Sequence, residues 1–157
     1  MTDPATDPEA RLAGLGFSLP AVVAPVAAYV PTVRTGSLVY TAGQLPFVDG
    51  SLTHTGKVGA EVSPDDAKDL ARIAALNALA AIKAELGSLS LVRRVVKVVG
   101  FVASAPDFSG QPGVINGASE LLGEVFGDAG RHARSAVGVA VLPLDAPVEV
   151  ELIVEVA

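Results

Sequence analysis

Three side chains that carry or can carry a positive charge, Arg131, His132 and Arg134, stand within four residues of one another. They lead into AVGVAVLP, a run of small and apolar residues with the composition of a buried strand. Arginine keeps its charge in a protein, so a buried guanidinium needs an anion beside it. Because Arg134 opens this strand, the sequence predicts either an acidic side chain or a bound anion next to it.

Two strands, Arg134–Leu142 and Val148–Val156, are expected to position this arginine. If they pair as a hairpin, their valines pack together beneath helices, because side chains alternate between the two faces of a strand. The opposite face then holds Arg134, small residues and the three glutamates Glu149, Glu151 and Glu155. Such a hollow fits a small polar ligand. The alternative is a solvated sheet face with cross-strand ion pairs.

Two helices are indicated by their termini and by the spacing of apolar residues. The first begins after Ser63, a good N-cap followed by proline, and ends before Gly87. The second spans about Pro112–Phe126. The other strands are expected at Val26–Val33, Leu38–Ala42, Gly56–Gly59 and Val95–Ala103.

This order of elements predicts an α+β fold, a two-layer sandwich with a mainly antiparallel sheet and two helices on one face. Residues 1–15 are expected to form a tail with a short helix at Glu9–Leu15. Residues 16–157 are expected to form a single domain, since the length fits one core.

The composition excludes several functional classes. A net charge of −6 with no basic stripe counts against nucleic acid as a partner. The absence of cysteine excludes a thiol nucleophile, and a total of two histidines counts against a transition-metal cage. The acidic N-terminus and the lack of an apolar run of membrane length predict a cytoplasmic protein without membrane contact. The mean hydropathy of +0.51 predicts apolar surface buried between subunits.

Three segments resemble markers of the RidA/YjgF family, which is also labelled endoribonuclease L-PSP or translation-initiation-inhibitor-like. They are YVPTVRTGSLVYTAGQLP, INGASELLGEVFG and ARSAVGVAVLPLDAPVEVE, and the resemblance spans about residues 20–157. It implies a chorismate-mutase-like fold assembled as a homotrimer with ligand clefts between subunits. It also implies hydrolysis of 2-aminoacrylate-type enamines and imines to 2-keto acids and ammonia, without a metal or organic cofactor.

Carried over by position, the resemblance implies that Arg134 holds the substrate carboxylate and that Glu149 positions or activates water. Tyr29 corresponds to an aromatic residue that closes the cleft, and Asn116 to an asparagine at the start of the second helix. Backbone groups near Gly43 and Ala136 complete the implied site. The sequence departs from the family pattern at two positions, where Ala136 replaces a common cysteine and Ala42 a common serine.

The leading interpretation is therefore a deaminase of small enamine or imine acids. The alternative is a non-catalytic module that binds a small carboxylate such as a 2-keto acid, because Arg134 would serve both. Ribonuclease activity is the interpretation that the acidic composition favours least. His132 and Arg131 are expected to lie in a solvated loop.

Overall fold

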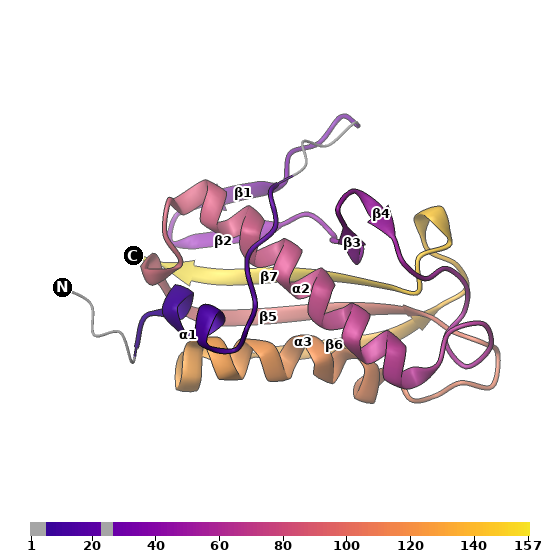
Figure 1. Cartoon of the computed structure of the whole chain (residues 1–157). Coiled ribbons are helices and arrows are strands. Elements are labelled where there is room, and N and C mark those ends of the chain that lie inside the picture. Colours follow the sequence, from indigo (N-terminus) through magenta and orange to yellow (C-terminus); the bar gives the residue numbers. More distant parts are fainter. Residues whose placement is uncertain (1–5, 23–26) are drawn as a thin grey trace.

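The computed structural model describes residues 6–22 and 27–157 as a sheet with helices on one face (Figure 1). In chain order the elements are α1 (Pro8–Gly14), β1 (Thr32–Thr35), β2 (Leu38–Thr41), β3 (Phe47–Val48), β4 (Ser51–Leu52), α2 (Pro64–Leu86), β5 (Val92–Ala103), α3 (Gln111–Phe126), β6 (Ala133–Val139) and β7 (Val148–Val156). The predicted α+β fold, with a mainly antiparallel sheet, is confirmed.

The main sheet has the strand order β1-β2-β7-β5-β6, and only the β5–β6 pair is parallel. The expected hairpin between the last two strands is therefore wrong. Because β5, α3 and β6 form a strand–helix–strand unit, the crossover places β6 parallel to β5 and beside it. The next strand, β7, pairs with the other side of β5 and fills the centre of the sheet.

The parallel pairing also changes which side chains of β6 face the helices. Residues that pair side by side share a face, and Arg134 pairs with Val98, whose partner on β7 is the buried Leu152. Arg134 therefore lies on the helix side of the sheet. The valines of β6 face the opposite side, called the open face below, where Val137 is 46% exposed. The prediction that these valines pack beneath the helices is wrong.

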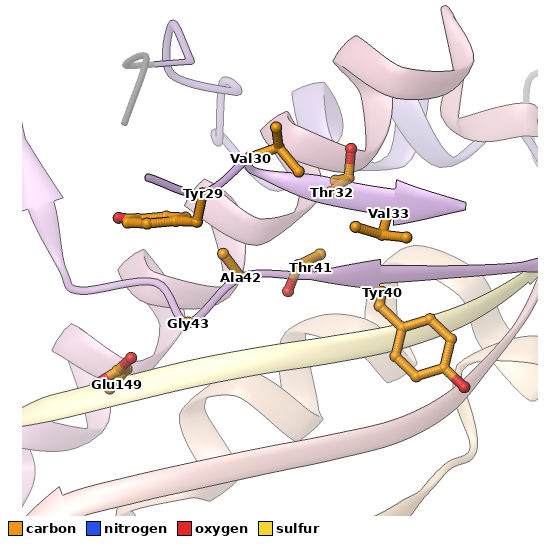
Figure 2. Close-up of a pocket in the computed structure, with 9 residues that line it drawn as sticks. All are labelled: Tyr29, Val30, Thr32, Val33, Tyr40, Thr41, Ala42, Gly43 and Glu149. Atoms are coloured by element: carbon orange, nitrogen blue, oxygen red, sulfur yellow. The ribbon is translucent and has the colours of Figure 1, made fainter. Parts of the chain in front are cut away.

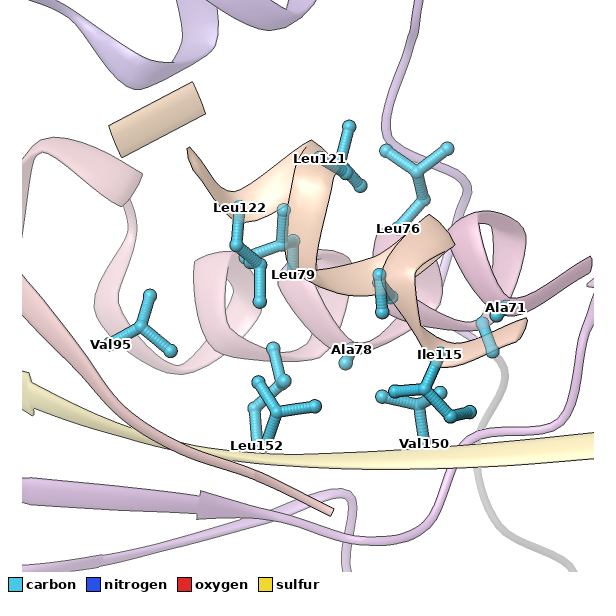
Figure 3. Packing of buried hydrophobic residues seen from close by; sticks show 14 of the residues in the cluster. Ala71, Leu76, Ala78, Leu79, Val95, Ile115, Leu121, Leu122, Val150 and Leu152 are labelled. Atoms are coloured by element: carbon cyan, nitrogen blue, oxygen red, sulfur yellow. The ribbon is translucent and has the colours of Figure 1, made fainter. Parts of the chain in front are cut away.

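The core between the sheet and the helices is aliphatic (Figure 3). Alternate residues of β7 are buried as predicted: Val148, Val150, Leu152, Val154 and Val156. They belong to one cluster with Leu79 of α2 and with Ile115 and Leu122 of α3. Many of the buried positions of α2 are alanines, which lets this helix lie close to its neighbours.

The helix boundaries agree closely with the sequence. The Ser63 side chain accepts a hydrogen bond from the Asp66 amide at 3.1 Å, and Gly87 ends α2 with a φ of 85°. The helix α3 begins one residue before the predicted start and ends at Phe126 as expected. The short helix predicted at Glu9–Leu15 is α1, and Glu9 joins it to α2 through an ion pair with Lys83 at 2.5 Å.

The first strands differ from the prediction in length. The strand expected from Val26 begins at Thr32, and Val26 itself lies outside the described residues. The strand expected at Gly56–Gly59 is reduced to isolated bridges at Val58. Asp49 and Gly50 form the turn of the short β3–β4 hairpin. No helix in the described part of the chain is both long and apolar enough to cross a membrane.

Helices α2 and α3 pack closely at Gly117, where an added Cβ would lie 1.9 Å from the Lys68 carbonyl oxygen. Gly117→Ala must push the two helices apart, and we expect the free energy of unfolding to fall by about 1–3 kcal/mol. Chemical denaturation measures this loss. Gly123→Ala is the matched control, since this exposed position of α3 has open space around it and alanine favours a helix. Equal stability of the two variants would contradict the prediction.

Candidate functional site

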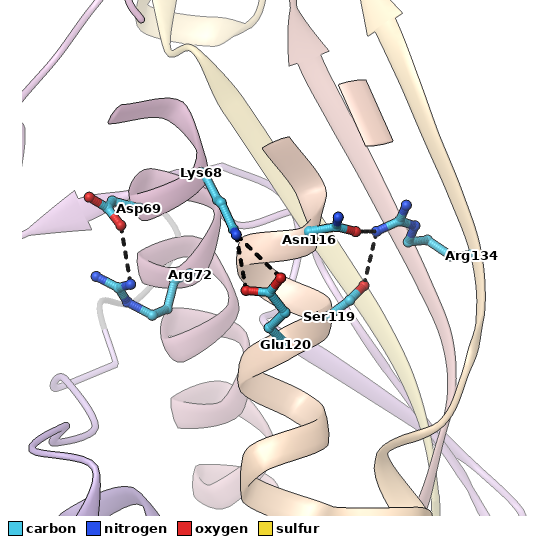
Figure 4. A network of polar contacts seen from close by, with 7 residues as sticks. All are labelled: Lys68, Asp69, Arg72, Asn116, Ser119, Glu120 and Arg134. Carbon is cyan, nitrogen blue, oxygen red and sulfur yellow. Dashed lines mark hydrogen bonds and ion pairs between the residues drawn. The ribbon is translucent and has the colours of Figure 1, made fainter. Parts of the chain in front are cut away.

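Arg134 lies half-buried in β6, with its guanidinium against helix α3 (Figure 4). Its Nη1 donates hydrogen bonds to Asn116 Oδ1 at 2.8 Å and to Ser119 Oγ at 3.2 Å. Both acceptors are neutral. Within residues 6–22 and 27–157, no carboxylate forms an ion pair with Arg134. The structure thus joins Arg134 to Asn116, and the residues it describes supply no acidic side chain for the charge of Arg134.

The two contacts to α3 use only one nitrogen of the guanidinium. Nε and Nη2 of Arg134 have no acceptor in the part of the chain that the structure describes. These two nitrogens form the edge through which a guanidinium binds a carboxylate by two parallel hydrogen bonds. The helix therefore orients Arg134 and leaves the edge that suits a carboxylate available.

A histidine and a serine extend this network, and neither was predicted as a site residue. His132 Nδ1 lies 2.6 Å from the Gly130 carbonyl oxygen, which can only accept, so Nδ1 carries the proton. In the neutral ring, Nε2 then accepts the hydroxyl proton of Ser119 at 2.9 Å. The prediction of a solvated His132 is wrong, whereas Arg131 is 87% exposed as expected. The three-residue spacing of Asn116 and Ser119, which puts both on one helix face, was the available signal.

The backbone of Ala136 faces the free edge of the sheet. The Val139 carbonyl accepts a hydrogen bond from the Ser104 amide at 3.0 Å, so the peptide groups of Val139 point toward β5. Peptide groups alternate sides along a strand, so those of Arg134 and Ala136 point outward from the edge strand β6. The N–H and C=O of Ala136 can therefore bind a ligand or a neighbouring chain.

The other predicted residues line a pocket of about 500 Å³ where β2 ends beside β7 (Figure 2). Tyr29, Gly43 and Glu149 are among its walls, and the Tyr29 side chain is 57% exposed. The full lining is Tyr29, Val30, Thr32, Val33, Tyr40, Thr41, Ala42, Gly43 and Glu149. The pocket therefore combines a carboxylate with a largely apolar and hydroxyl-bearing wall.

Gly43 and Glu149 are in close contact. A Cβ built on Gly43 would lie 1.9 Å from Glu149 Oε1, so a larger residue here would displace this carboxylate from its position. The neighbouring residues Gln44 and Val150 exchange two backbone hydrogen bonds of 2.8 and 3.0 Å, which hold the two segments together. The Gly43 N–H has no acceptor in residues 6–22 and 27–157, so the pocket offers a backbone donor near the carboxylate.

The electrostatic environment of Glu149 makes its carboxylate a stronger base. Burial raises the pKa of Glu149, and the nearby charge of Glu151 raises it further. No described residue forms a hydrogen bond or ion pair with the Glu149 carboxylate. Where the chain is described, no three His, Asp or Glu side chains gather to hold a metal ion.

The predicted site residues thus form two groups on opposite faces of one sheet. Glu149 pairs with Phe101, which pairs with Val137 of the open face, whereas Arg134 lies on the helix side. The expectation that Arg134 and Glu149 share a face is wrong, because it depended on the terminal hairpin. One chain does not place these two side chains in a common cavity.

Comparison with known proteins identifies the class. The family model described as "YjgF/chorismate_mutase-like, putative endoribonuclease" matches residues 9–156, and the chain belongs to this family. It is 46% identical over 147 residues to Protein TCP17 of Trypanosoma cruzi, covering 93% of this chain and 92% of that protein. It is 34% identical over 134 residues to the 2-iminobutanoate/2-iminopropanoate deaminase of Salmonella typhimurium, covering 85% and 89% respectively.

Solved structures agree with this membership. The protein Atu1372 of Agrobacterium tumefaciens, of unknown function, superimposes with a TM-score of 0.90 at 50% identity, covering 96% of this chain and 92% of that one. The structure of E. coli TdcF with bound serine superimposes with a TM-score of 0.61 at 27% identity, covering 87% and 94%. The resemblance to the RidA/YjgF family is thereby confirmed.

Proposed function

We propose that the chain is a hydrolytic deaminase that converts small 2-imino and enamine acids of the 2-aminoacrylate type to 2-oxo acids and ammonia. The observation that carries the proposal is the half-buried Arg134, which has no anionic partner in the described chain and keeps its Nε and Nη2 edge free. The deaminase name of the Salmonella relative and the serine bound by TdcF support a small carboxylate as the substrate class.

The proposed site is built from two copies of the chain. Its two groups lie on opposite faces of the sheet, so a substrate that meets both must lie between subunits. The open face presents large apolar side chains, including Val33 (55% exposed), Tyr40 (40%) and Val137 (46%). Burying such a surface favours association. We propose the homotrimer that the family resemblance implies, with the substrate in the clefts between subunits.

Arg134 binds the carboxylate of the substrate in this mechanism. Two parallel hydrogen bonds from Nε and Nη2 fix the plane of the carboxylate and thereby the position of the adjacent imine carbon. The outward backbone of Ala136 in the same strand supplies further hydrogen-bonding groups. Because these are backbone groups, the alanine that replaces the family's common cysteine retains them.

Glu149 of the neighbouring subunit acts on water. Its carboxylate accepts a proton as the water oxygen attacks the imine carbon, and the C=N double bond becomes a single bond in a tetrahedral adduct. The protonated Glu149 then donates this proton to the nitrogen. The same carboxylate takes up the hydroxyl proton of the adduct and passes it to the nitrogen as well, so the C–N bond breaks, ammonia departs and the C=O bond forms. The raised pKa of Glu149 suits both steps, because the group must take up and release a proton near neutral pH.

The direct test generates 2-iminobutanoate in solution and follows the release of 2-oxobutanoate. We expect the wild-type protein to accelerate hydrolysis in proportion to its concentration, above the spontaneous rate. A rate equal to the spontaneous rate, with intact folding and measurable binding of 2-oxobutanoate, would support the non-catalytic carboxylate-binding module instead. Arg134 alone suffices for that alternative, and Glu149 is the residue that favours chemistry.

The proposed homotrimer can be tested by its mass in solution. Light scattering at micromolar concentration should return three times the chain mass of 15.8 kDa. Replacing Val137 by glutamate should lower this mass, because it introduces a charge into an exposed apolar part of the open face. Val48→Glu, which changes an exposed valine of the separate β3–β4 hairpin, is the control. A monomer mass for the wild type would overturn the shared cleft.

The ribonuclease label of the family leads to a negative prediction. With a net charge of −6, the chain should bind single-stranded RNA only weakly, with a dissociation constant above about 100 μM at physiological salt. Fluorescence anisotropy with a labelled oligonucleotide measures this. Sub-micromolar binding that weakens as salt is added would contradict the prediction.

A further inference from the structure

The hydroxyl–imidazole pair of Ser119 and His132 takes no part in the chemistry proposed above, yet it ends on the guanidinium of Arg134. The hydrogen bonds from His132 Nδ1 to the Gly130 carbonyl, from Ser119 to His132 Nε2 and from Arg134 Nη1 to Ser119 measure 2.6, 2.9 and 3.2 Å. This polar chain connects the segment before β6 to the arginine through the surface of α3.

We infer that His132 and Ser119 are positioning residues that hold the Arg134 guanidinium so that it distinguishes a carboxylate from neutral substituents. The inference rests on the proposed function, since it assigns Arg134 to the substrate carboxylate. Ser119 and His132 act through the arginine and need not touch the substrate.

The Gly130 carbonyl, at one end of this polar chain, determines the direction of the hydrogen bonds that follow it. The Gly130 carbonyl can only accept, so His132 Nδ1 donates and Nε2 of the neutral ring accepts from Ser119. The Ser119 oxygen then keeps its lone pairs for Arg134 Nη1. Gly130 is buried and packed tightly, since a Cβ there would lie 2.3 Å from the Leu122 carbonyl oxygen. The group that orients His132 is therefore itself held against α3.

Two anchors on the same nitrogen restrict the rotation of the guanidinium. Asn116 and Ser119 lie three residues apart on one face of α3, and both accept from Nη1 (Figure 4). With Nη1 turned toward the helix, the opposite edge of Nε and Nη2 faces away from it. If Ser119 is lost, only the Asn116 contact remains, and the guanidinium can turn about it. Bidentate binding depends on that orientation, whereas a single hydrogen bond to a neutral amide does not.

The test compares two ligands, 2-oxobutanoate and its neutral analogue 2-oxobutanamide, by calorimetric titration. Ser119→Ala and His132→Phe should weaken binding of 2-oxobutanoate by about three- to tenfold and change binding of the amide by less than about twofold. Ser119→Thr keeps the hydroxyl and His132→Gln keeps an acceptor, so both should stay within about threefold of the wild type. Ser109→Ala and His54→Gln, at exposed positions, are the controls.

Arg134→Ala, titrated in parallel, separates the two proposals. If it loses 2-oxobutanoate binding while Ser119→Ala and His132→Phe retain it, the inference fails and the proposed function stands. Equal weakening of both ligands in those two variants shows a general structural role and also overturns the inference. If the wild type binds no 2-oxobutanoate, or Arg134→Ala binds it normally, the carboxylate role of Arg134 fails, and the inference fails with it.

Discussion

Arg134→Ala is expected to weaken the binding of 2-oxobutanoate by about ten- to a hundredfold. Removing a charge-assisted pair of hydrogen bonds to a partly desolvated carboxylate costs about 1.5–3 kcal/mol, and each 1.4 kcal/mol corresponds to a factor of ten in affinity. Arg134→Lys should restore little of the lost affinity, because an ammonium group cannot make two parallel hydrogen bonds in one plane. Calorimetric titration measures both effects.

Thermal unfolding of the same variants separates a ligand role from a structural one. The partners of Arg134 in the described chain are the neutral groups of Asn116 and Ser119, so its removal leaves no buried charge unpaired. We therefore expect the melting temperature to change by only a few degrees. Arg131→Ala is the control, since this arginine is three residues away and exposed. Unchanged affinity together with a large fall in melting temperature would make Arg134 a structural residue.

Glu149→Gln should reduce kcat for 2-iminobutanoate by about 10²- to 10⁴-fold, the range that general acid–base catalysis supplies. The amide can neither take the proton from water nor return it to nitrogen. Affinity for the product 2-oxobutanoate should change by less than about threefold, because Arg134 provides that binding. A variant with normal kcat would remove Glu149 from the mechanism and leave the carboxylate-binding role of Arg134 intact.

Glu151→Gln is the matched control, two residues farther along the same strand and on the same face. It should keep kcat near the wild-type value at neutral pH. Because the charge of Glu151 raises the pKa of Glu149, its removal should also move the acidic limb of the pH–rate profile to lower pH. A profile that stays in place would show that the two carboxylates do not interact.

The raised pKa of Glu149 has a second measurable consequence, in stability. The folded chain binds this proton more tightly than the unfolded chain, whose carboxyl has its ordinary pKa of 4.5. Protonation of Glu149 therefore stabilises the folded chain. This stabilisation is complete below pH 4.5 and is lost as the pH rises through the pKa of Glu149 in the folded chain. Glu149→Gln, which stays neutral, should therefore melt at a higher temperature than the wild type at pH 7, and this difference should disappear as the pH falls below 4.5.

The sequence predicted those elements whose pattern is local. The alternating valines of β7 and the caps of α2 specify their own structure, and both are found where expected. The neighbour of β6 was not predictable from alternation, because a period of two fits either face and either partner. A strand–helix–strand crossover places its two strands parallel in one sheet, and this rule, applied to β5, α3 and β6, predicts the observed neighbour of β6. The wrong hairpin in turn placed Arg134 and Glu149 on one face.

The site residues divide in the same way. Arg134 was noticed because a charge beside an apolar strand demands a partner, and Asn116 followed from the family resemblance. Ser119 and His132 meet only through the register between α3 and the segment before β6, which no local pattern encodes. Gly43 also followed from the family resemblance, but its close contact with Glu149 required the folded chain, since the two residues lie 106 positions apart.

The central position of β7 governs when the domain can fold during synthesis. This strand pairs with both β2 and β5, yet it follows every other strand of the sheet along the chain. A nascent chain that has emerged only through β6 lacks the strand that joins its two halves, and its longest strand keeps one edge unpaired. Folding of this domain on the ribosome must therefore wait until residues 148–156 have left the exit tunnel, and chaperones have that interval in which to bind the exposed edges.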